Sequence, residues 1–228
     1  MRDGTASRSG LWAPSWRFHV KHEARALRIS ETLSEDVVCK LQEYVRLLAR
    51  WKNVTNLTAA DSFDQLWNRH IEDSIYIQKS CPTARLWLDV GSGAGFPAIV
   101  IASILSEADG ARVHCVESDG RKCAFLRVVA DRLKIPVKVH QARIETLSPD
   151  VAPHVEVVTA RAFSSLRQTL TVTKRYLDQG AIAILPRGRS ALSEVVALDS
   201  SGYTITIKPN PNHSDGVILH VENRDREL

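Results

Sequence analysis

The sequence LWLDVGSGAGFPAIVI at residues 86–101 decides the fold of this chain. Its apolar start, residues 86–90, is typical of a buried strand, and Pro97 suits the first turn of a helix, where a backbone N–H is not needed. The three alternate glycines tolerate unusual backbone angles and let a ligand approach the main chain closely. The stretch therefore predicts a strand, a tight turn and a helix around a cofactor pocket, with an ordinary strand-to-helix turn as the alternative.

The spacing of the glycines distinguishes between classes of nucleotide-derived ligand. The dinucleotide fingerprint is G-x-G-x-x-G, whereas here the third glycine comes one residue early and Phe96 takes the place of the last glycine. A P-loop ends in Lys followed by Ser or Thr, and no such pair follows these glycines. Residues 89–95, DVGSGAG, resemble instead the first motif of S-adenosylmethionine (SAM) methyltransferases. A turn with Asp89 at its mouth and no requirement for an anion suits a cationic sulfonium ligand.

A second strand is expected at residues 112–117, and it ends in Glu117. A carboxylate about 20 residues after the glycine turn can accept hydrogen bonds from both hydroxyls of a ribose, in NAD and SAM sites alike. A solvated glutamate at a strand end is the alternative. Asp119 then caps a helix whose apolar residues follow helical spacing.

Composition bounds the class of protein. With 228 residues, of which 44% are hydrophobic and 25% charged, the chain is expected to be soluble, with one α/β domain and an appendage. It has no secretory signal and no apolar run of the ~20 residues that a membrane span requires, so we expect a cytoplasmic protein without membrane contact. The formal net charge of +4 favours a polyanionic partner. The four cysteines show no zinc spacing, so we expect free thiols and no metal: Cys39, Cys81, Cys115 and Cys123.

Residues 1–30 follow neither a helical nor a strand period. They are rich in arginine and poor in acidic residues, which fits a transit peptide or a disordered basic arm. We favour a third interpretation, in which residues 1–19 are an upstream, mis-assigned start and Val20 is encoded by an alternative start codon. The rest of the chain is divided into an N-terminal helical extension, 31–80, and a SAM-dependent methyltransferase domain, 81–228.

Helices and strands alternate regularly after this leader. Apolar residues at three- and four-residue spacing predict one helix at 34–51 and a second at about 61–80. The last two strands have turn residues and no helix between them, so we expect an antiparallel hairpin. The pattern predicts an α/β fold, a mostly parallel seven-stranded sheet of the Rossmann-like class I methyltransferase type. The expected strands lie near 86–90, 112–117, 137–141, 155–160, 180–185, 203–208 and 216–221.

Five segments carry a family resemblance over nearly the whole chain from residue 34 on. They are Trp51-Lys52-Asn53 with Asn56-Leu57-Thr58, Arg69 to Ser74, Asp89 to Pro97, Glu117 to Leu126, and Thr159 to Leu166, which contains Arg-Ala-Phe-Ser-Ser-Leu. Their order and spacing resemble the bacterial small-subunit rRNA guanine-N7 methyltransferases, the methyltransferase G or glucose-inhibited division protein B family. The family's designation places its target guanine at position 527 of 16S rRNA.

The resemblance implies SAM as the cofactor and 16S rRNA, in the small ribosomal subunit or its assembly precursor, as the partner of what we expect to be a monomer. This family usually has Lys-Gly after the fifth strand, where this chain has Arg187-Gly188, so the role of that lysine transfers only weakly. The resemblance places SAM against Gly91, Phe96, Ile144, Glu145 and Arg161. The motif analysis adds Asp89, Gly93, Gly95 and Glu117, and the candidates for positioning the substrates are Arg161, His70 and Arg187.

The expected chemistry asks for no general base. Guanine N7 holds a lone pair and no proton, so it can attack the methyl group directly, and catalysis rests on in-line positioning. His70, Asp73 and Ser74 lie within five residues on one predicted helix and lack a nucleophile elbow, which argues against a Ser-His-Asp triad. They are the expected groups for tying the N-terminal helices to the cofactor domain.

The basic residues of the sequence are only a weak signal for RNA contact, because solvated helix faces also carry cations. The candidate basic residues are Arg46, Arg50, Lys52, Arg121, Lys122, Arg127, Arg187 and Arg189. Two other classes stay open: a SAM methyltransferase that acts on a protein or a small molecule, and a non-catalytic nucleotide-binding protein. Methyl transfer to deproteinised rRNA would separate the first of these from an rRNA enzyme.

Overall fold

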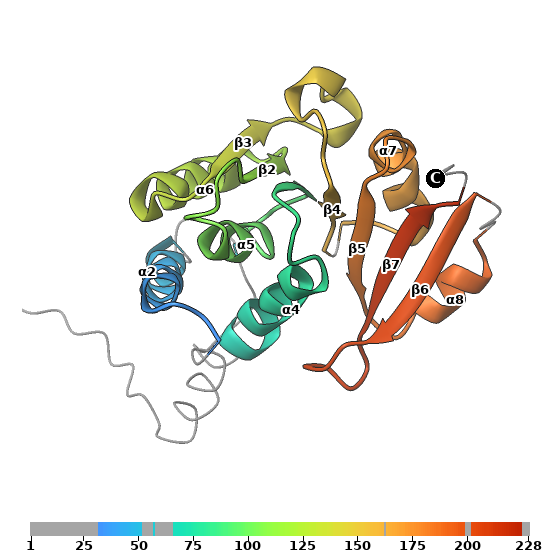
Figure 1. Ribbon diagram of the computed structural model, residues 1–228, viewed down its shortest axis with the longest axis horizontal. Coiled ribbons are helices and arrows are strands. Elements are labelled where there is room, and N and C mark those ends of the chain that lie inside the picture. The colour runs from blue at the N-terminus through green and yellow to red at the C-terminus, as the bar shows by residue number, and fades with distance from the viewer. Residues whose placement is uncertain (1–31, 52–56, 58–65, 162, 199–201, 225–228) are drawn as a thin grey trace, which may run out of the picture.

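The computed structural model describes residues 32–51, 57, 66–161, 163–198 and 202–224 (Figure 1). The leader at 1–30 and the beginning of the helix expected from residue 61 lie outside the described residues. No helix in the described ranges is long and apolar enough to cross a membrane. The division at residue 80 stays a prediction.

A seven-stranded sheet of the described residues has the order β3-β2-β1-β4-β5-β7-β6. Strands β1 to β5 run parallel, while β7 pairs antiparallel with both β5 and β6. This confirms the predicted α/β fold with its terminal hairpin. The strands are β1 (Leu86–Val90), β2 (Arg112–Glu117), β3 (Val137–Gln141), β4 (Val157–Thr159), β5 (Ile182–Arg187), β6 (Tyr203–Pro209) and β7 (Val217–Asn223).

Helices cover both faces of this sheet. The helix expected at 34–51 is confirmed as α2, whereas the part of the second helix that the structure describes contains a π-helical turn, η1, before α4. Two 3₁₀ turns, η2 and η3, follow β3. The bounds are α2 (Glu35–Trp51), η1 (Trp67–Ile71), α4 (Glu72–Ser80), α5 (Ala98–Ile104), α6 (Gly120–Leu133), η2 (Ile144–Thr146), η3 (Pro149–Val151), α7 (Leu166–Asp178) and α8 (Ala191–Val196).

Four strands, β4 to β7, differ from the sequence prediction at their ends. Strand β4 is shorter than the expected 155–160, and β5 begins at Ile182 rather than at 180. The reason at β5 is Gly180, whose φ of 97° lies in the left-handed region. Its N–H donates to the carbonyl of Leu177, so the residue ends α7 instead of starting the strand.

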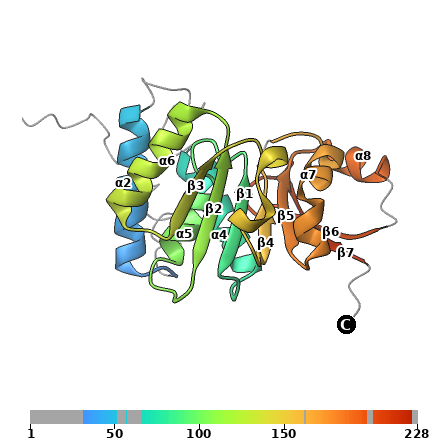
Figure 2. The same ribbon diagram turned by 90° about the horizontal axis from the view of Figure 1, so that it is seen from above.

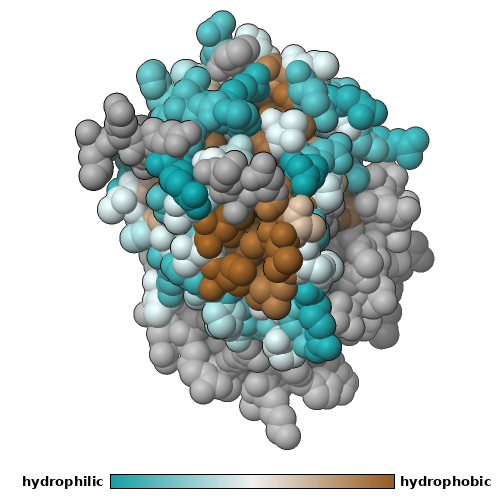
Figure 3. Space-filling view, turned by 90° about the vertical axis from the view of Figure 1, so that its right-hand side faces the viewer, coloured by the Kyte–Doolittle hydropathy of each residue, from teal (hydrophilic) through white to brown (hydrophobic). Residues whose placement is uncertain are grey.

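Two hydrophobic clusters lie on opposite faces of the sheet, because neighbouring side chains of a strand point to opposite sides. On β1, Trp87 belongs to the cluster with α2, α4, α5 and α6, whereas Leu88 belongs to the cluster with α7 (Figure 2). Figure 3 shows an apolar patch on the side of the molecule where α8 and the edge strand β6 lie. The large apolar residues exposed on these two elements are Leu192 and Val196 of α8 and Ile207 of β6.

Helix α2 supports the glycine turn directly. The fully buried Tyr44 donates a hydrogen bond of 2.7 Å to the carbonyl of Ala94, in the middle of the turn. Its ring also packs against Phe96, with ring centroids 5.2 Å apart, and against Phe125 of α6. The N-terminal helices and the sheet therefore share one core, and α2 fixes the position of the turn.

Candidate functional site

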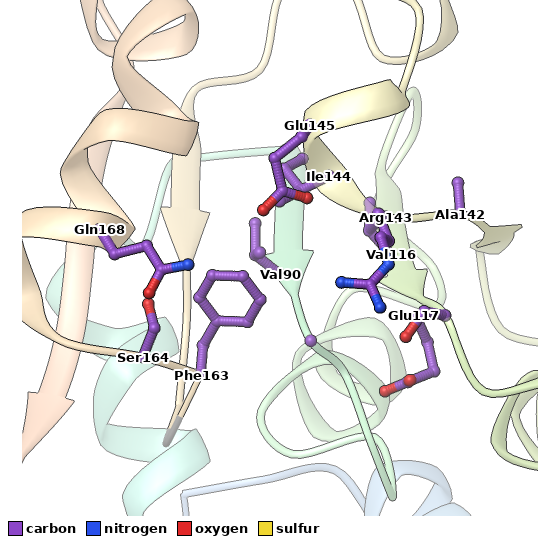
Figure 4. Close-up of a pocket in the computed structure, with 12 residues that line it drawn as sticks. Val90, Val116, Glu117, Ala142, Arg143, Ile144, Glu145, Phe163, Ser164 and Gln168 are labelled. Atoms are coloured by element: carbon purple, nitrogen blue, oxygen red, sulfur yellow. The ribbon is translucent and has the colours of Figure 1, made fainter.

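A cavity of about 370 Å³ opens at the carboxyl ends of the parallel strands, where open α/β sheets bind ligands (Figure 4). Its volume lies in the range of small-molecule sites, roughly 300–1,000 Å³. One wall consists of residues that follow β2 and β3. The other consists of residues that follow β4 and lie in the first turn of α7, and the end of β1 lies between the two walls. The lining residues are Val90, Gly91, Val116, Glu117, Ser118, Ala142, Arg143, Ile144, Glu145, Phe163, Ser164 and Gln168.

The three glycines of the turn have three different structural roles, although all have positive φ. A Cβ on Gly91 would lie 2.8 Å from Cδ2 of Phe163, so this glycine makes room for an aromatic ring on the pocket wall. A Cβ on Gly93 would meet only the carbonyl oxygen of Gly91, at an ordinary contact distance of 3.8 Å, and the N–H of Gly93 donates to Glu117 Oε2 at 2.9 Å. A Cβ on Gly95 would collide with Ile99 of α5, so that glycine allows the helix to pack closely.

Glu117 is held rigidly at the end of β2. One carboxylate oxygen accepts from Gly93 N–H and the other accepts from Asp119 N–H at 2.9 Å. A carboxylate has about four lone-pair positions, so both oxygens can accept a further hydrogen bond each. The side chain lines the cavity, and this geometry suits a ribose diol. Asp119 caps α6 through the N–H groups of Arg121 and Lys122, as the sequence predicts.

Asp89 lies beneath the turn and is 2% exposed. Burial raises the pKa of its carboxyl group to about 7, although hydrogen bonds from Thr159 and Ser92 and the charge of Arg161 oppose the rise. Thr159 donates to Oδ1 at 2.6 Å, while Oδ2 has no hydrogen-bond partner among the described residues. The site thus holds a carboxylate that a nearby positive charge would stabilise in its ionised form.

Arg161 follows β4 and is largely surrounded by protein. Burial lowers the pKa of its guanidinium, and the nearby carboxyl groups of Asp73 and Asp89 oppose that shift. The charge of Arg161 is therefore close enough to Asp73 of α4 and Asp89 of β1 to interact with both, and Arg161 is not among the lining residues of the cavity.

Asp73 connects α4 to the turn between β6 and β7. Its carboxylate accepts from the side-chain amides of Asn210 and Asn212, at 3.3 and 3.0 Å, and lies 3.1 Å from Nε2 of His213. Ser74 donates to the carbonyl of His70 within the same helix. The Asp73 contacts thus join α4 to the β6–β7 turn, whereas the Ser74 hydrogen bond stays within the N-terminal helices.

The structure brings four of the predicted cofactor residues to the cavity surface. They are Gly91, Glu117, Ile144 and Glu145. The other five lie beneath or beside the lining: Asp89, Gly93, Gly95, Phe96 and Arg161. The ring of Phe96 is 8% exposed and stacks on His70, with centroids 4.8 Å apart, so in this structure both rings pack together beside the turn.

Arg187 differs from the sequence expectation of a cation available to RNA. Its Nη1 donates to the Ser164 carbonyl at 2.7 Å, and its Nη2 donates to Thr169 Oγ1 at 2.8 Å. Burial lowers the pKa of its guanidinium. The side chain is turned inward, because β5 ends beside the segment that links β4 to α7. Arg189 keeps an exposed side chain, which pairs with Asp215.

Sequence reasoning did not assign eight of the lining residues, among them Arg143, Phe163, Ser164 and Gln168. Phe163 and Ser164 lie within the Arg-Ala-Phe-Ser-Ser-Leu segment, so a signal was present, but nothing local marks Phe163 as a pocket residue. Arg143 directly precedes the two predicted residues Ile144 and Glu145 and is exposed at the cavity.

Comparisons with known proteins agree with this geometry. The family profile described as rRNA small subunit methyltransferase G matches residues 38–212. The Ribosomal RNA small subunit methyltransferase G of Brucella ovis is 37% identical over 203 residues, covering 87% of this chain and 93% of that protein. The protein of the same name from Methylorubrum extorquens is 37% identical over 195 residues, covering 85% and 92%.

Solved structures support the fold. A putative O-methyltransferase from Klebsiella pneumoniae aligns with a TM-score of 0.55 at 15% identity, over 89% of this chain and 98% of that chain. A SAM-dependent methyltransferase from Aquifex aeolicus aligns with a TM-score of 0.54 at 13% identity, over 69% and 92%. At this level of identity the likeness establishes a class I methyltransferase fold.

Proposed function

This chain belongs to the rRNA small subunit methyltransferase G family, and from that premise we propose that it transfers the methyl group of SAM to N7 of a guanine in 16S rRNA, expected at position 527. The observation that supports this most strongly is the cavity at the carboxyl ends of the strands, with Gly91 and Glu117 on its surface. We infer the acceptor from the family membership, and we infer the binding site of the cofactor from the cavity.

The described residues fit SAM in shape and charge. Glu117 offers free lone pairs to the ribose. Ile144 and Glu145 line the part of the cavity in which we propose that the adenine of SAM binds. Buried Asp89, with one oxygen that lacks a partner among the described residues, provides negative charge near the turn. When bound, SAM supplies a methyl group on a positively charged sulfur.

The transfer needs no proton to move. The N7 lone pair forms the new bond to the methyl carbon, the sulfur–carbon bond breaks, and its electron pair stays on sulfur. The positive charge passes to the purine. The protein's part is therefore to bind, to orient and to exclude water, and none of the lining residues has to act as a base.

The acceptor guanine must be reachable. The deep, narrow major groove of A-form RNA hides N7, so we propose an unpaired or looped guanine in the small subunit or its precursor. Exposed cations suited to the RNA backbone are Arg143 at the cavity and Arg121 and Arg127 on α6. We propose that the protein acts on the ribosome in the cytoplasm as a monomer.

Chemical mapping tests this function. Borohydride and aniline cleave RNA at N7-methylguanosine, so small-subunit rRNA is compared between cells with and without the protein. We expect one cleavage site in 16S rRNA that depends on the protein. Identical cleavage patterns in the two strains would reject the function.

A further inference from the structure

Phe163 is the one aromatic side chain among the described residues that line the cavity. Figure 4 shows its ring between the wall that carries Glu117 and Glu145 and the wall that carries Ser164 and Gln168. The ring is half-buried, and it lies so close to the glycine turn that a Cβ on Gly91 would be 2.8 Å from it. A flat apolar surface thus borders the cavity on the side away from Glu117.

We propose that Phe163 is the surface on which the target guanine stacks during methyl transfer, and that Arg187 is the residue that positions the Phe163 ring. This inference rests on the proposed function and names the acceptor side of the same site. Proteins commonly hold an unpaired RNA base by stacking it on an aromatic ring. The wall with Glu117, Ile144 and Glu145 suits the cofactor, so the opposite wall is left for the base.

The charge that develops on the base favours this position. Methylation at N7 makes the purine cationic, and the face of an aromatic ring attracts cations. Phe163 therefore interacts more strongly with the methylated, positively charged base than with the neutral one. An aliphatic side chain of similar size would keep the apolar contact and lose this preference.

Arg187 holds the segment that carries the ring. Its two hydrogen bonds, to the Ser164 carbonyl and to Thr169 Oγ1, join the residue after Phe163 to the first turns of α7. Ser164 and Thr169 lie 3.2 Å apart through their hydroxyl oxygens, so the guanidinium closes a small network. A lysine ammonium lacks the planar fork of a guanidinium, which can donate to both acceptors from one fixed plane.

Two variants of Phe163 test the stacking. Phe163→Leu removes the aromatic face and Phe163→Tyr keeps it, so they form a matched pair whose folding is checked by thermal melting. We expect Phe163→Leu to slow single-turnover methyl transfer to 16S rRNA about 10- to 100-fold, as for the loss of one base stack. Phe163→Tyr should stay within about threefold of wild type, and calorimetry should show SAM affinity within about twofold for both.

Different failures have different meanings. Wild-type rates in a folded Phe163→Leu variant would overturn the inference. A tenfold loss of SAM affinity in that variant would also overturn it, because the ring would then belong to the cofactor. If the wild-type protein binds SAM but leaves N7 unmodified, the proposed function itself fails.

A double-mutant cycle tests the positioning role of Arg187. Arg187→Ala should slow the transfer with little effect on SAM affinity, and Arg187→Lys should restore part of the rate. If Arg187 acts through Phe163, the double variant Arg187→Ala with Phe163→Leu should be no slower than Phe163→Leu alone. Independent, multiplying effects would overturn this part of the inference.

Discussion

The two walls of the cavity are built in different ways. On the wall with Glu117, Ile144 and Glu145, the Glu117 carboxylate is held by two backbone donors, the N–H groups of Gly93 and Asp119. The wall with Phe163 is held by a side chain, that of Arg187, which comes from another strand. The comparison teaches that main-chain groups fix the carboxylate on the cofactor side, whereas the acceptor side depends on one side chain.

The largest effect is expected from a substitution that disturbs the contact between the glycine turn and the wall with Phe163. Gly91 and Gly110 have nearly the same φ, 70° and 71°, but only Gly91 has Phe163 in the way of a Cβ. Both Gly→Ala variants carry similar backbone strain, of order 1 kcal/mol. The Cβ of Gly91→Ala would displace the Phe163 ring, so we expect this variant to slow single-turnover methyl transfer about 100-fold and Gly110→Ala to leave the rate unchanged. Equal transfer rates in the two variants would contradict the close packing at the turn.

Acid should destabilise the strands that carry the cofactor wall. Burial, and then the charges of His140, Lys138 and Arg112, lower the pKa of His114 to about 4. The folded state therefore prefers neutral His114, and stability is lost as the pH falls from about 6.5 towards 4. We expect His114→Gln to reduce this loss in the free energy of unfolding by about 1–3 kcal/mol, as measured by denaturant titrations at each pH. An unchanged slope would mean that other groups govern the acid sensitivity.

Asp89 should make SAM affinity depend on pH. Its folded pKa of about 7 lies above its unfolded value, so the stability it contributes is full at low pH and is lost as the pH rises through 7. A cationic ligand reverses this preference, so SAM should bind about tenfold more tightly at pH 8 than at pH 6, with release of a proton. Asp89→Asn should abolish both effects in calorimetry, whereas transfer rates at saturating SAM should stay flat with pH. A proton release that persists in Asp89→Asn would assign it elsewhere.

The smallest expected effect concerns the rim of the cavity. Arg143 is exposed at the carboxyl ends of the strands, whereas Arg112 is exposed at the amino end of β2. Arg143→Ala should raise the KM for rRNA a few-fold and reduce the salt slope by about 1, because one phosphate contact is lost. Arg112→Ala serves as the control and should change neither. Equal effects of the two substitutions would place the RNA differently.

Much of the fold could be predicted because its signals are local. The apolar run of β1, the glycines after it and the Asp119 cap depend on neighbouring residues, and the mostly parallel sheet follows from the alternation of helices and strands. The start of β5 was missed because Gly180 ends α7, a competition that periodicity does not resolve. The candidate site divides in the same way.

On the cofactor side, the sequence pointed to Gly91 and Glu117, and the structure places both on the cavity. On the acceptor side, Arg187 was expected both as a candidate for positioning the substrates and as a cation for RNA, but no sequence pattern reveals that its guanidinium reaches Ser164 and Thr169. Phe163 was part of a recognised segment without an assigned role. Long-range hydrogen bonds of this kind depend on the three-dimensional packing of β5 against α7.

The most direct test of the account replaces the atom that accepts the methyl group. Small subunits are reconstituted with 16S rRNA transcribed either with guanosine or with 7-deazaguanosine, which has a C–H group in place of N7. The purified protein is then supplied with SAM that carries a labelled methyl group. The account predicts labelling of the guanosine subunits and none of the 7-deazaguanosine subunits. Equal labelling of the two would contradict transfer to N7.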